Sequence, residues 1–293
     1  MANIAAKTVV ATGASSGLGF EVVKQLLAKS EPYRFILGAR DTETTKKAYD
    51  ELKFDSAIHS ITVLPLELSN LNDVKSFAHK TLKNLGQDKL DYLFLNAGMA
   101  KGAEGPAVHG SKWCELYVVN HLSQHYLTHL LREKLVASKS RVVIVSSGAV
   151  SRVTDTAELD KTFLAGSGRD PINTYSETKF AQLLGAHWWR RQLPECNVVA
   201  VSPGLIPLTG IARYGGFSLS MAMPDAKTVP EGAQSILRAF TRTDFPADPE
   251  QIFLTSWGEW WPKTVYEKTL DKKLQDKWCP SKEKIEEEEG LAL

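Results

Sequence analysis

The sequence predicts one α/β domain with a doubly wound, seven-stranded and mainly parallel sheet that helices cover on both faces. Short apolar runs rich in β-branched residues alternate with segments whose apolar residues recur at helical spacing. Several of these runs end directly in Gly, Ala, Ser or Asn. Strand and helix alternation is typical of a parallel sheet, and small residues at strand ends let a ligand approach the backbone.

Size and composition agree with a globular domain. The chain has 293 residues, 43% of them hydrophobic, and 35 basic residues balance 34 acidic ones. This balance argues against a nucleic-acid-binding surface, and the three scattered cysteines do not suggest a disulfide framework. The sequence has no signal-like start and no uninterrupted apolar span of about 20 residues. We therefore expect a cytoplasmic protein with no integral membrane segment.

The first predicted strand, at residues 8–11, leads into a glycine-rich turn and then a helix over residues 20–30. Glycines in such a turn let the chain bend sharply and approach a pyrophosphate, which the helix N-terminus then attracts. A strand before the turn and a helix after it are the context of a dinucleotide-binding, Rossmann-like fold. The predicted cofactor contacts here are Gly13, Ser15, Ser16, Gly17, Leu18 and Gly19.

The second strand, at residues 34–39, ends where the adenosine ribose of a dinucleotide is expected. Ala39 cannot bind the ribose 2′-hydroxyl as an acid would, whereas the Arg40 guanidinium can clamp a 2′-phosphate. We therefore expect NADP(H) as the cofactor. The neighbouring Asp41 keeps NAD(H) open, and a solvated surface arginine is the alternative for Arg40.

The rest of the chain continues the alternation. Further strands are predicted at residues 58–66, 90–95, 141–145, 197–201 and 252–255. Further helices are predicted at residues 42–54, 74–85, 111–136, 174–193, 228–240 and 264–278. Residues 150–171 have the composition of a polar excursion outside the core, and the acidic run 286–289 that of a solvated end.

Two tyrosines precede a lysine by four residues, so that on a helix each pair would share one face. A nearby ammonium group lowers the pKa of a phenol, which makes Tyr175 beside Lys179 a candidate proton donor and acceptor. Tyr49 and Lys53 have the same spacing, but no strand end or glycine turn lies beside them. We interpret that second pair as a surface helix pair.

Three histidines, His121, His125 and His129, follow one another at four-residue steps in the predicted helix 111–136. Such a stripe can bind a metal, but no cysteine or acidic ligand accompanies it. Histidines held by hydrogen bonds in a core or an oligomer interface are the preferred interpretation, so no metal site is predicted.

Together these motifs resemble the short-chain dehydrogenase/reductase family over residues 7–254. The resemblance rests on the glycine loop 12–19, Asn96-Ala97-Gly98, Asn120, a serine after the fifth strand, Tyr175 with Lys179, and Pro203-Gly204. Of two adjacent serines, Ser147 matches the family position and Ser146 is the alternative. Glu67-Leu68 stands where the family usually has Asp-Leu.

The resemblance implies that NADPH reduces a carbonyl group while Tyr175 donates the proton. Ser147 would hold the carbonyl oxygen, Lys179 would bind the nicotinamide ribose and lower the Tyr175 pKa, and Asn120 would support a water relay. Further implied cofactor contacts are Glu67, Leu68, Asn96, Ala97, Gly98, Tyr175, Lys179, Pro203, Gly204, Ile206 and Thr209.

The substrate is expected to be a lipophilic ketone or aldehyde, or the corresponding alcohol, covered by a loop at residues 205–228. Apolar residues there and after the Asn-Ala-Gly turn are Leu205, Ile206, Phe217, Met221, Met223 and Met99. These side chains would either bind the substrate or simply pack over the nicotinamide.

Residues 1–256 would form the catalytic domain and residues 257–293 a Trp-rich helical extension. A homo-oligomer and a monomer are both compatible with the sequence. The alternative functions are an NAD-dependent alcohol dehydrogenase working in the oxidative direction and a non-catalytic NADP-binding sensor or scaffold. A sugar-nucleotide epimerase would need a differently spaced glycine loop and a larger C-terminal domain.

Overall fold

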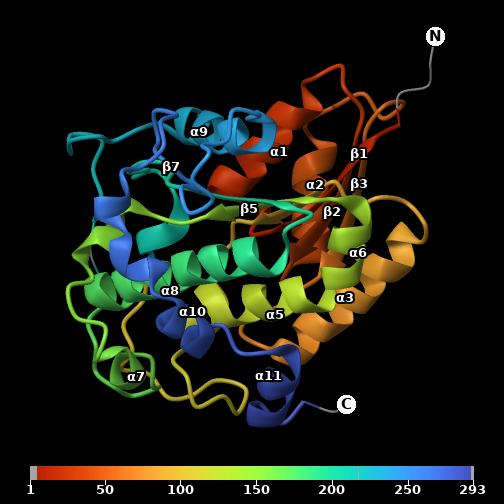
Figure 1. The fold of residues 1–293 in the computed structure, drawn as a ribbon. Coiled ribbons are helices and arrows are strands. Elements are labelled where there is room, and N and C mark those ends of the chain that lie inside the picture. The colour runs from red at the N-terminus through yellow and green to blue at the C-terminus, as the bar shows by residue number, and fades with distance from the viewer. Residues whose placement is uncertain (1–4, 217, 292–293) are drawn as a thin grey trace.

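A computed structural model describes residues 5–216 and 218–291. The seven-stranded sheet has the order β3-β2-β1-β4-β5-β6-β7, and each neighbouring pair is parallel (Figure 1). The strand order reverses between β1 and β4, which is where open parallel sheets bind ligands. The strands are β1 Lys7–Thr12, β2 Tyr33–Ala39, β3 Ser60–Pro65, β4 Tyr92–Leu95, β5 Arg141–Val145, β6 Asn197–Val201 and β7 Phe253–Leu254.

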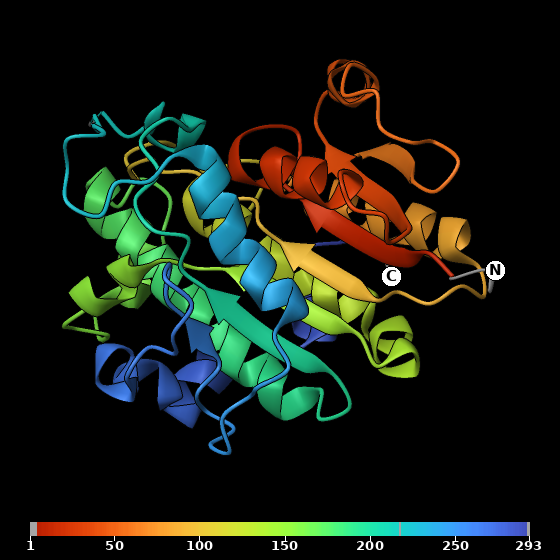
Figure 2. The ribbon, with the colours of Figure 1, turned by 90° about the horizontal axis from the view of Figure 1, so that it is seen from above.

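Helices cover both faces of the sheet, which confirms the predicted doubly wound α/β fold. Helices α1 Gly17–Leu27, α2 Thr42–Asp50 and α9 Val229–Thr241 pack on one face, and α1 lies beside α9 (Figure 2). The opposite face carries α3 Leu71–Leu85, α4 Glu115–Tyr117, α5 Ser123–Leu130 and α8 Pro171–Gln192. The shorter helices are α6 Arg132–Ser138, α7 Leu159–Thr162, α10 Lys272–Trp278 and α11 Lys282–Glu288. No helix in the described chain has the length and apolar character that a membrane span requires.

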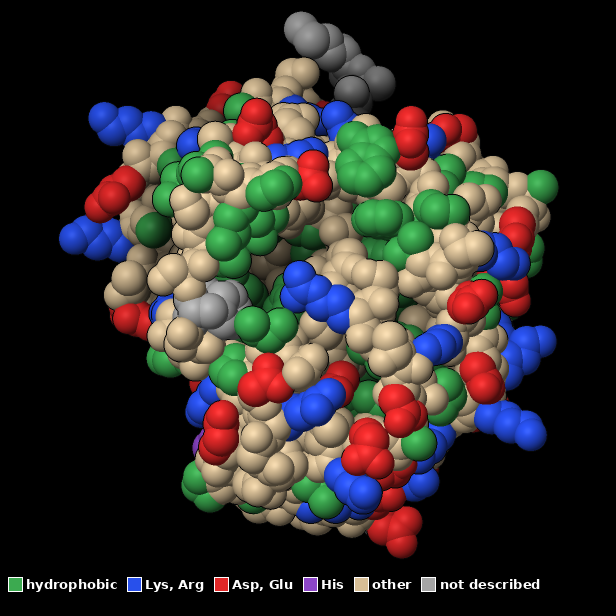
Figure 3. All heavy atoms as spheres, turned by 90° about the vertical axis from the view of Figure 1, so that its left-hand side faces the viewer, with side chains coloured by type: hydrophobic (Ala, Val, Ile, Leu, Met, Phe, Trp, Pro, Cys, Tyr) green, Lys and Arg blue, Asp and Glu red, His purple; other side chains and the backbone are tan. Residues whose placement is uncertain are grey.

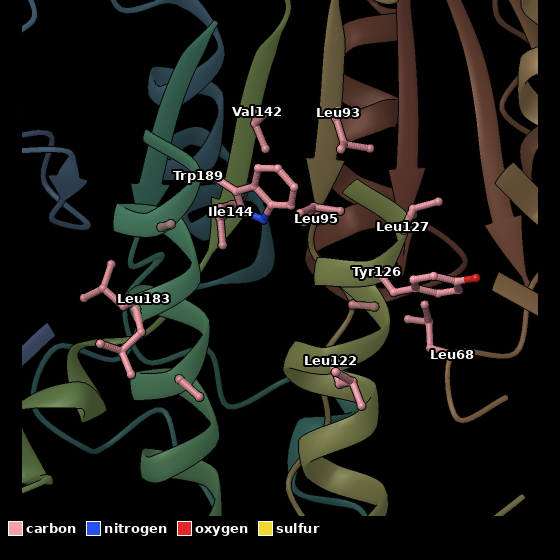
Figure 4. Packing of buried hydrophobic residues seen from close by; sticks show 14 of the residues in the cluster. Leu68, Leu93, Leu95, Leu122, Tyr126, Leu127, Val142, Ile144, Leu183 and Trp189 are labelled. Carbon is pink, nitrogen blue, oxygen red and sulfur yellow. The ribbon is translucent and has the colours of Figure 1, made fainter. Parts of the chain in front are cut away.

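The larger core lies between the sheet and the helices α5 and α8. Trp189 of α8 lies between Ile144 and Leu95 of the sheet, and Tyr126 of α5 lies beside Leu68 (Figure 4). Successive residues of a strand face opposite sides, so a strand buried on both faces must be apolar throughout. This is why the central strands are continuous apolar runs rather than alternating ones.

The segment 150–171 is not the polar excursion that its composition predicts. Leu159 and Phe163 are fully buried in the core, and α7 begins at the first of them. The backbone N–H of Cys114 donates to the carbonyl oxygen of Phe163 over 2.7 Å. Two large apolar residues spaced four apart therefore anchor an otherwise polar segment against the core.

The C-terminal segment also differs from prediction, because residues 264–278 do not form one helix. Two short 3₁₀ turns, Lys263–Val265 and Glu267–Leu270, precede α10. Asp271 has extended backbone geometry, and its carboxylate accepts a hydrogen bond from the Lys273 N–H over 2.8 Å. An N-cap at this position starts a new helix and so interrupts the predicted one.

The acidic run at residues 286–289 is not wholly solvated either. Glu286 is only 3% exposed, and it accepts a hydrogen bond from the Tyr126 hydroxyl over 2.7 Å. Lys75 and Lys282 each lie 3.6 Å from its carboxylate. Glu286 therefore fixes α11 against α5 rather than ending the chain in water.

The histidine stripe also holds the C-terminal segment. His121 donates to the carbonyl oxygen of Trp278 over 2.7 Å, while His125 and His129 reach that of Pro280 over 2.9 and 3.1 Å. Burial lowers the pKa of His121 and of His129 to about 4. The rings are thus neutral hydrogen-bonding groups between α5 and the C-terminal segment.

We predict that acid destabilises the protein through these histidines. Between pH 6.5 and 4 the unfolded chain binds protons that the folded chain excludes, so the free energy of unfolding falls as the pH is lowered through this range. His129→Gln should show a smaller fall in Tm between pH 7 and pH 5 than the unchanged protein. His79, which is exposed on α3, provides the control substitution His79→Gln. Equal falls in Tm for all three proteins would contradict the prediction.

Candidate active site

One cavity of about 930 Å³ lies at the carboxyl ends of the strands and contains most of the predicted site residues. Figure 3 shows this face hollowed, with hydrophobic side chains on the border and Lys or Arg side chains beside the opening. Only Gly19 and Asn120 of the predicted residues do not line it. Gly19 packs against Gly13 and Asn96, and Asn120 is hydrogen-bonded to Met99, so both contact residues that line the cavity.

The glycine loop is packed too closely for any larger side chain at two positions. A Cβ on Gly13, whose φ is +64°, would lie 2.5 Å from the Cα of Ala97. A Cβ on Gly19 would lie 2.2 Å from the carbonyl oxygen of Gly13. Ser16 gives α1 no side-chain cap, so the first N–H groups of this helix are available to an anion. The loop therefore fits a pyrophosphate.

A hydrogen-bond network that the sequence does not reveal joins this loop to α5. The Thr12 hydroxyl accepts from the N–H groups of Asn96 and Ala97, both over 3.2 Å, and donates to Gln124 over 3.0 Å. The Asn96 side chain donates to the carbonyl oxygen of Gly13 over 2.7 Å. Asn96 is therefore a brace for the glycine loop. In the sequence Gln124 belongs to no recognisable motif, so its role could not be predicted.

The Tyr49 and Lys53 pair is not the surface helix pair that was predicted. Tyr49 is 1% exposed, and its hydroxyl donates to the carbonyl oxygen of Ala14 over 2.6 Å. Lys53 lies beyond the end of α2 with a φ of +50°. Tyr49 therefore supports the glycine loop from below, while the lysine takes no part.

Arg40 lines the cavity at the end of β2, and no carboxylate of the described chain forms an ion pair with it. The neighbouring Asp41 caps α2, accepting from the N–H of Thr44 over 2.9 Å and from its hydroxyl over 2.6 Å. These hydrogen bonds hold the pKa of Asp41 below its usual value. The acid is occupied by the helix, and the guanidinium is left for a 2′-phosphate.

Glu67 lines the same end of the cavity with Leu68. One carboxylate oxygen of Glu67 accepts from both the N–H and the hydroxyl of Ser69, each over 2.9 Å. This fixes the longer acidic side chain close to its own backbone. Glu67 is therefore placed to contact an adenine, because its second carboxylate oxygen is available to accept a hydrogen bond from the base.

Asn120 is fully buried on a π-helical turn, Val118–Leu122, between α4 and α5. Its amide accepts from the N–H of Met99 and donates to the Met99 carbonyl oxygen and the Thr178 hydroxyl, all over 3.0 Å. Turns of this kind are frequent at functional sites. Asn120 thereby ties the turn after β4 to the helix that carries Tyr175.

The two adjacent serines have different surroundings. Ser146 is 1% exposed, and its hydroxyl donates to the carbonyl oxygen of Lys179 over 3.3 Å. Ser147 lines the cavity, and a hydrogen bond between its side chain and the Tyr175 phenol lowers the pKa of that phenol. The geometry favours Ser147 for contact with a substrate carbonyl and gives Ser146 a structural position.

Tyr175 and Lys179 lie on one face of α8 as their spacing predicts, but the pKa effect is different. The Lys179 ammonium lies 5.9 Å from the centre of the Tyr175 ring and donates to Val145 O over 2.8 Å and to Gln182 over 3.0 Å. Burial raises the pKa of Tyr175 above its ordinary value, despite the lowering effects of Ser147 and Arg152. Burial also lowers the pKa of Lys179 to about 7. The expected depression of the phenol pKa is therefore wrong for this structure.

Pro203 and Gly204 follow β6 and turn the chain toward the loop 205–228. Gly204 has a φ of +96°, and a Cβ there would lie 3.2 Å from Lys227 and from Ser256. Thr209 lines the cavity beside Gly17, so this loop reaches back over the glycine turn. The segment thus closes one side of the cavity.

Met99, Leu205, Ile206 and Met223 line the cavity as predicted for apolar residues near the substrate. Met221 does not line it, and Phe217 lies outside the described residues. Two further cavity residues, Trp257 and Trp261, were predicted only as part of the C-terminal extension. Their position just after β7, at the same edge as the other strand ends, is the signal that could have found them.

Comparison with known proteins adds a family match. The family model for short chain dehydrogenases matches residues 7–156. A short-chain dehydrogenase/reductase of Pestalotiopsis microspora is 60% identical over 290 residues, which cover 98% of this chain and all of that protein. Human retinol dehydrogenase 11 is 29% identical over 93% of this chain and 85% of its own length.

Solved structures with the same fold include two carbonyl reductases. The NADPH-bound carbonyl reductase from chicken fatty liver has a TM-score of 0.64 and 19% identity, and covers 88% of this chain and 95% of its own. The carbonyl reductase Sniffer of D. melanogaster has a TM-score of 0.64 and 20% identity, with 87% and 98% covered. At these identities the likeness is one of fold.

We predict that Tyr49 stabilises the glycine loop whereas Lys53 does not. Tyr49→Phe removes the buried hydrogen bond to Ala14 and should lower the free energy of unfolding by about 1–2 kcal/mol. Lys53→Gln should change it by less than about 0.5 kcal/mol. Urea unfolding of both variants measures the difference, and equal stabilities would contradict this assignment.

Proposed function

The chain belongs to the short-chain dehydrogenase/reductase family, and on that premise we propose that it is an NADPH-dependent carbonyl reductase that converts a ketone or aldehyde to an alcohol. The observation that carries the proposal is the position of the Tyr175 phenol, which lines the cavity in hydrogen-bonding contact with Ser147 and has the Lys179 ammonium 5.9 Å from the centre of its ring. A protonated phenol suits the donor in a reduction better than the base in an oxidation.

The reaction consumes the carbonyl compound, NADPH and one proton, and yields the alcohol and NADP⁺. NADPH supplies the hydride when it is bound. Ser147 donates a hydrogen bond to the carbonyl oxygen, and Tyr175 transfers its proton to that oxygen as negative charge develops there. Lys179, held at the carbonyl oxygen of Val145, has a further N–H for the nicotinamide ribose. Asn120 supports a water relay that returns a proton to Tyr175.

NADP(H) is the cofactor that the residues of the cavity fit. Arg40 would bind the 2′-phosphate, the N-terminus of α1 the pyrophosphate, and the chain at Asn96-Ala97-Gly98 would line the nicotinamide side. The capping role of Asp41 argues against NAD(H), because the carboxylate is hydrogen-bonded to Thr44 instead of facing a ribose hydroxyl. These positions support NADPH-dependent reduction over the NAD-dependent oxidation of an alcohol.

A lipophilic substrate is supported by the apolar wall of the cavity. Met99, Leu205 and Met223 line it together with Trp257 and Trp261. Trp261 lies next to the turn after β5, since a Cβ on Gly148 would be 3.5 Å from it. The apolar wall therefore continues up to the residue that follows Ser147.

Tyr175→Phe should lower kcat about 10²- to 10⁴-fold, because general acid catalysis contributes a factor of this size. The Kd for NADPH should change little, since the phenyl ring still fills its place. Ser147→Ala should also lose activity, whereas Ser146→Ala is the matched control. NADPH oxidation with a panel of aldehydes and ketones measures the rates. Retention of full activity by Tyr175→Phe would remove the basis of the proposal.

Arg40→Ala should weaken the preference for NADPH over NADH about 10- to 100-fold, the value of one charge-assisted contact with the 2′-phosphate. Asp41→Ser, which keeps a helix-capping side chain, should leave the preference nearly unchanged. The ratio of kcat/KM for the two cofactors measures both effects. If Asp41→Ser changed the preference more than Arg40→Ala did, the assignment of cofactor choice to Arg40 would be contradicted.

A further inference from the structure

The cavity has one cation at its catalytic centre that the proposed mechanism does not use. Arg152 ends a 3₁₀ turn, Gly148–Arg152, that begins directly after Ser147, and its side chain is exposed and lines the cavity. None of the described carboxylates lies within ion-pair distance of its guanidinium. Its charge also acts on the partly buried Tyr175 phenol and lowers the pKa of that group.

The other charges on the substrate side of the cavity are placed differently. Lys101 forms an ion pair with Glu115 at 2.5 Å, so these two neutralise each other. Arg213 donates to the carbonyl oxygen of Gly210 over 3.1 Å and lies over the Tyr214 ring. Asp225 is exposed on the loop and belongs to the same lining. Arg152 is thus the cation of this region whose charge acts on Tyr175 and which forms no ion pair with any described residue.

Apolar side chains line the same cavity as this cation. Trp261 packs toward Gly148 in the turn that carries Arg152, and Trp257 and Trp261 contact each other edge to face with their centres 5.5 Å apart. Ile172, at the start of α8, is 47% exposed and lines the opening. A ligand that matches this region has a flat apolar body and an anionic group within reach of the reacting carbonyl.

Resting on the carbonyl reductase activity proposed above, we propose that Arg152 binds the carboxylate of the substrate, so that the substrate class is aromatic or similarly flat apolar aldehydes and ketones that bear a carboxylate. A guanidinium binds a carboxylate through two parallel charge-assisted hydrogen bonds, which fix orientation as well as position. Arg152 is a specificity-determining residue in this scheme. Proton donation remains with Tyr175.

The test compares 2-, 3- and 4-carboxybenzaldehyde with their methyl esters, which differ from the acids in charge and by one methyl group. For at least one positional isomer, kcat/KM with NADPH should favour the acid by about 10-fold or more. Arg152→Gln should abolish this acid-to-ester ratio, and Arg152→Lys should keep part of it. Arg213→Gln is the control that removes another cation of the region, one held at the carbonyl oxygen of Gly210, and should leave the ratio unchanged.

Binding gives a second measurement that does not depend on turnover. In the presence of NADP⁺, 2-naphthoate should quench the tryptophan fluorescence of the protein, and Arg152→Gln should weaken its binding about 10-fold while 2-naphthalenemethanol is unaffected. Equal use of acids and esters, or a ratio that follows Arg213 rather than Arg152, would overturn the inference and leave the reductase proposal intact. No NADPH oxidation with any of the six compounds or with a wider carbonyl panel would instead contradict the reductase proposal, and the inference with it.

Discussion

The close contact between the glycine loop and the turn after β4 is the constraint on which the site depends. Gly13 approaches the Ala97 backbone so closely that a Cβ would lie 2.5 Å from its Cα, and Thr12 bonds both to this turn and to Gln124. The loop for the cofactor, the turn at the nicotinamide side and α5 therefore move as one unit. Asn120 extends the same connection to Thr178 on α8, and so to the helix of the catalytic tyrosine.

The residues that line the cavity could be predicted because their signals are local. Glycines between a strand and a helix, or a tyrosine four residues before a lysine, are recognisable without knowledge of any distant contact. The side chains that hold them in place could not be predicted in this way. Gln124 accepts a hydrogen bond from the Thr12 hydroxyl and donates one to the carbonyl oxygen of Ala97, and Tyr49 donates one to the carbonyl oxygen of Ala14. These partners are 27 or more residues away in the chain, so the contacts are consequences of the finished fold.

The C-terminal segment shows the same difference between local signals, which the sequence reveals, and distant contacts, which it does not. The four-residue spacing of the histidines predicts that they share one face of a helix, and the structure places His121 on the π-helical turn before α5 and His125 and His129 on α5, with all three facing the C-terminal segment. Their partners, the carbonyl oxygens of Trp278 and Pro280, are about 150 residues further along the chain and have no side-chain signature. Burial of Glu286 against Tyr126 has the same origin. An acidic run that composition assigns to solvent therefore becomes part of the core because one of its members meets a buried hydroxyl.

The charged side chains around the cavity differ in whether the protein itself provides them with a hydrogen-bond or ion-pair partner. Three of the acidic side chains there are held by the protein itself: Asp41 caps a helix, Glu67 bonds to Ser69, and Glu115 pairs with a lysine, while Asp225 is exposed on the loop. Arg40 and Arg152 line the cavity and have no such partner in the described chain. The site consequently favours negative charge at two places about a neutral phenol. The 2′-phosphate of NADP(H) fits the first, and the carboxylate of the proposed substrate would fit the second.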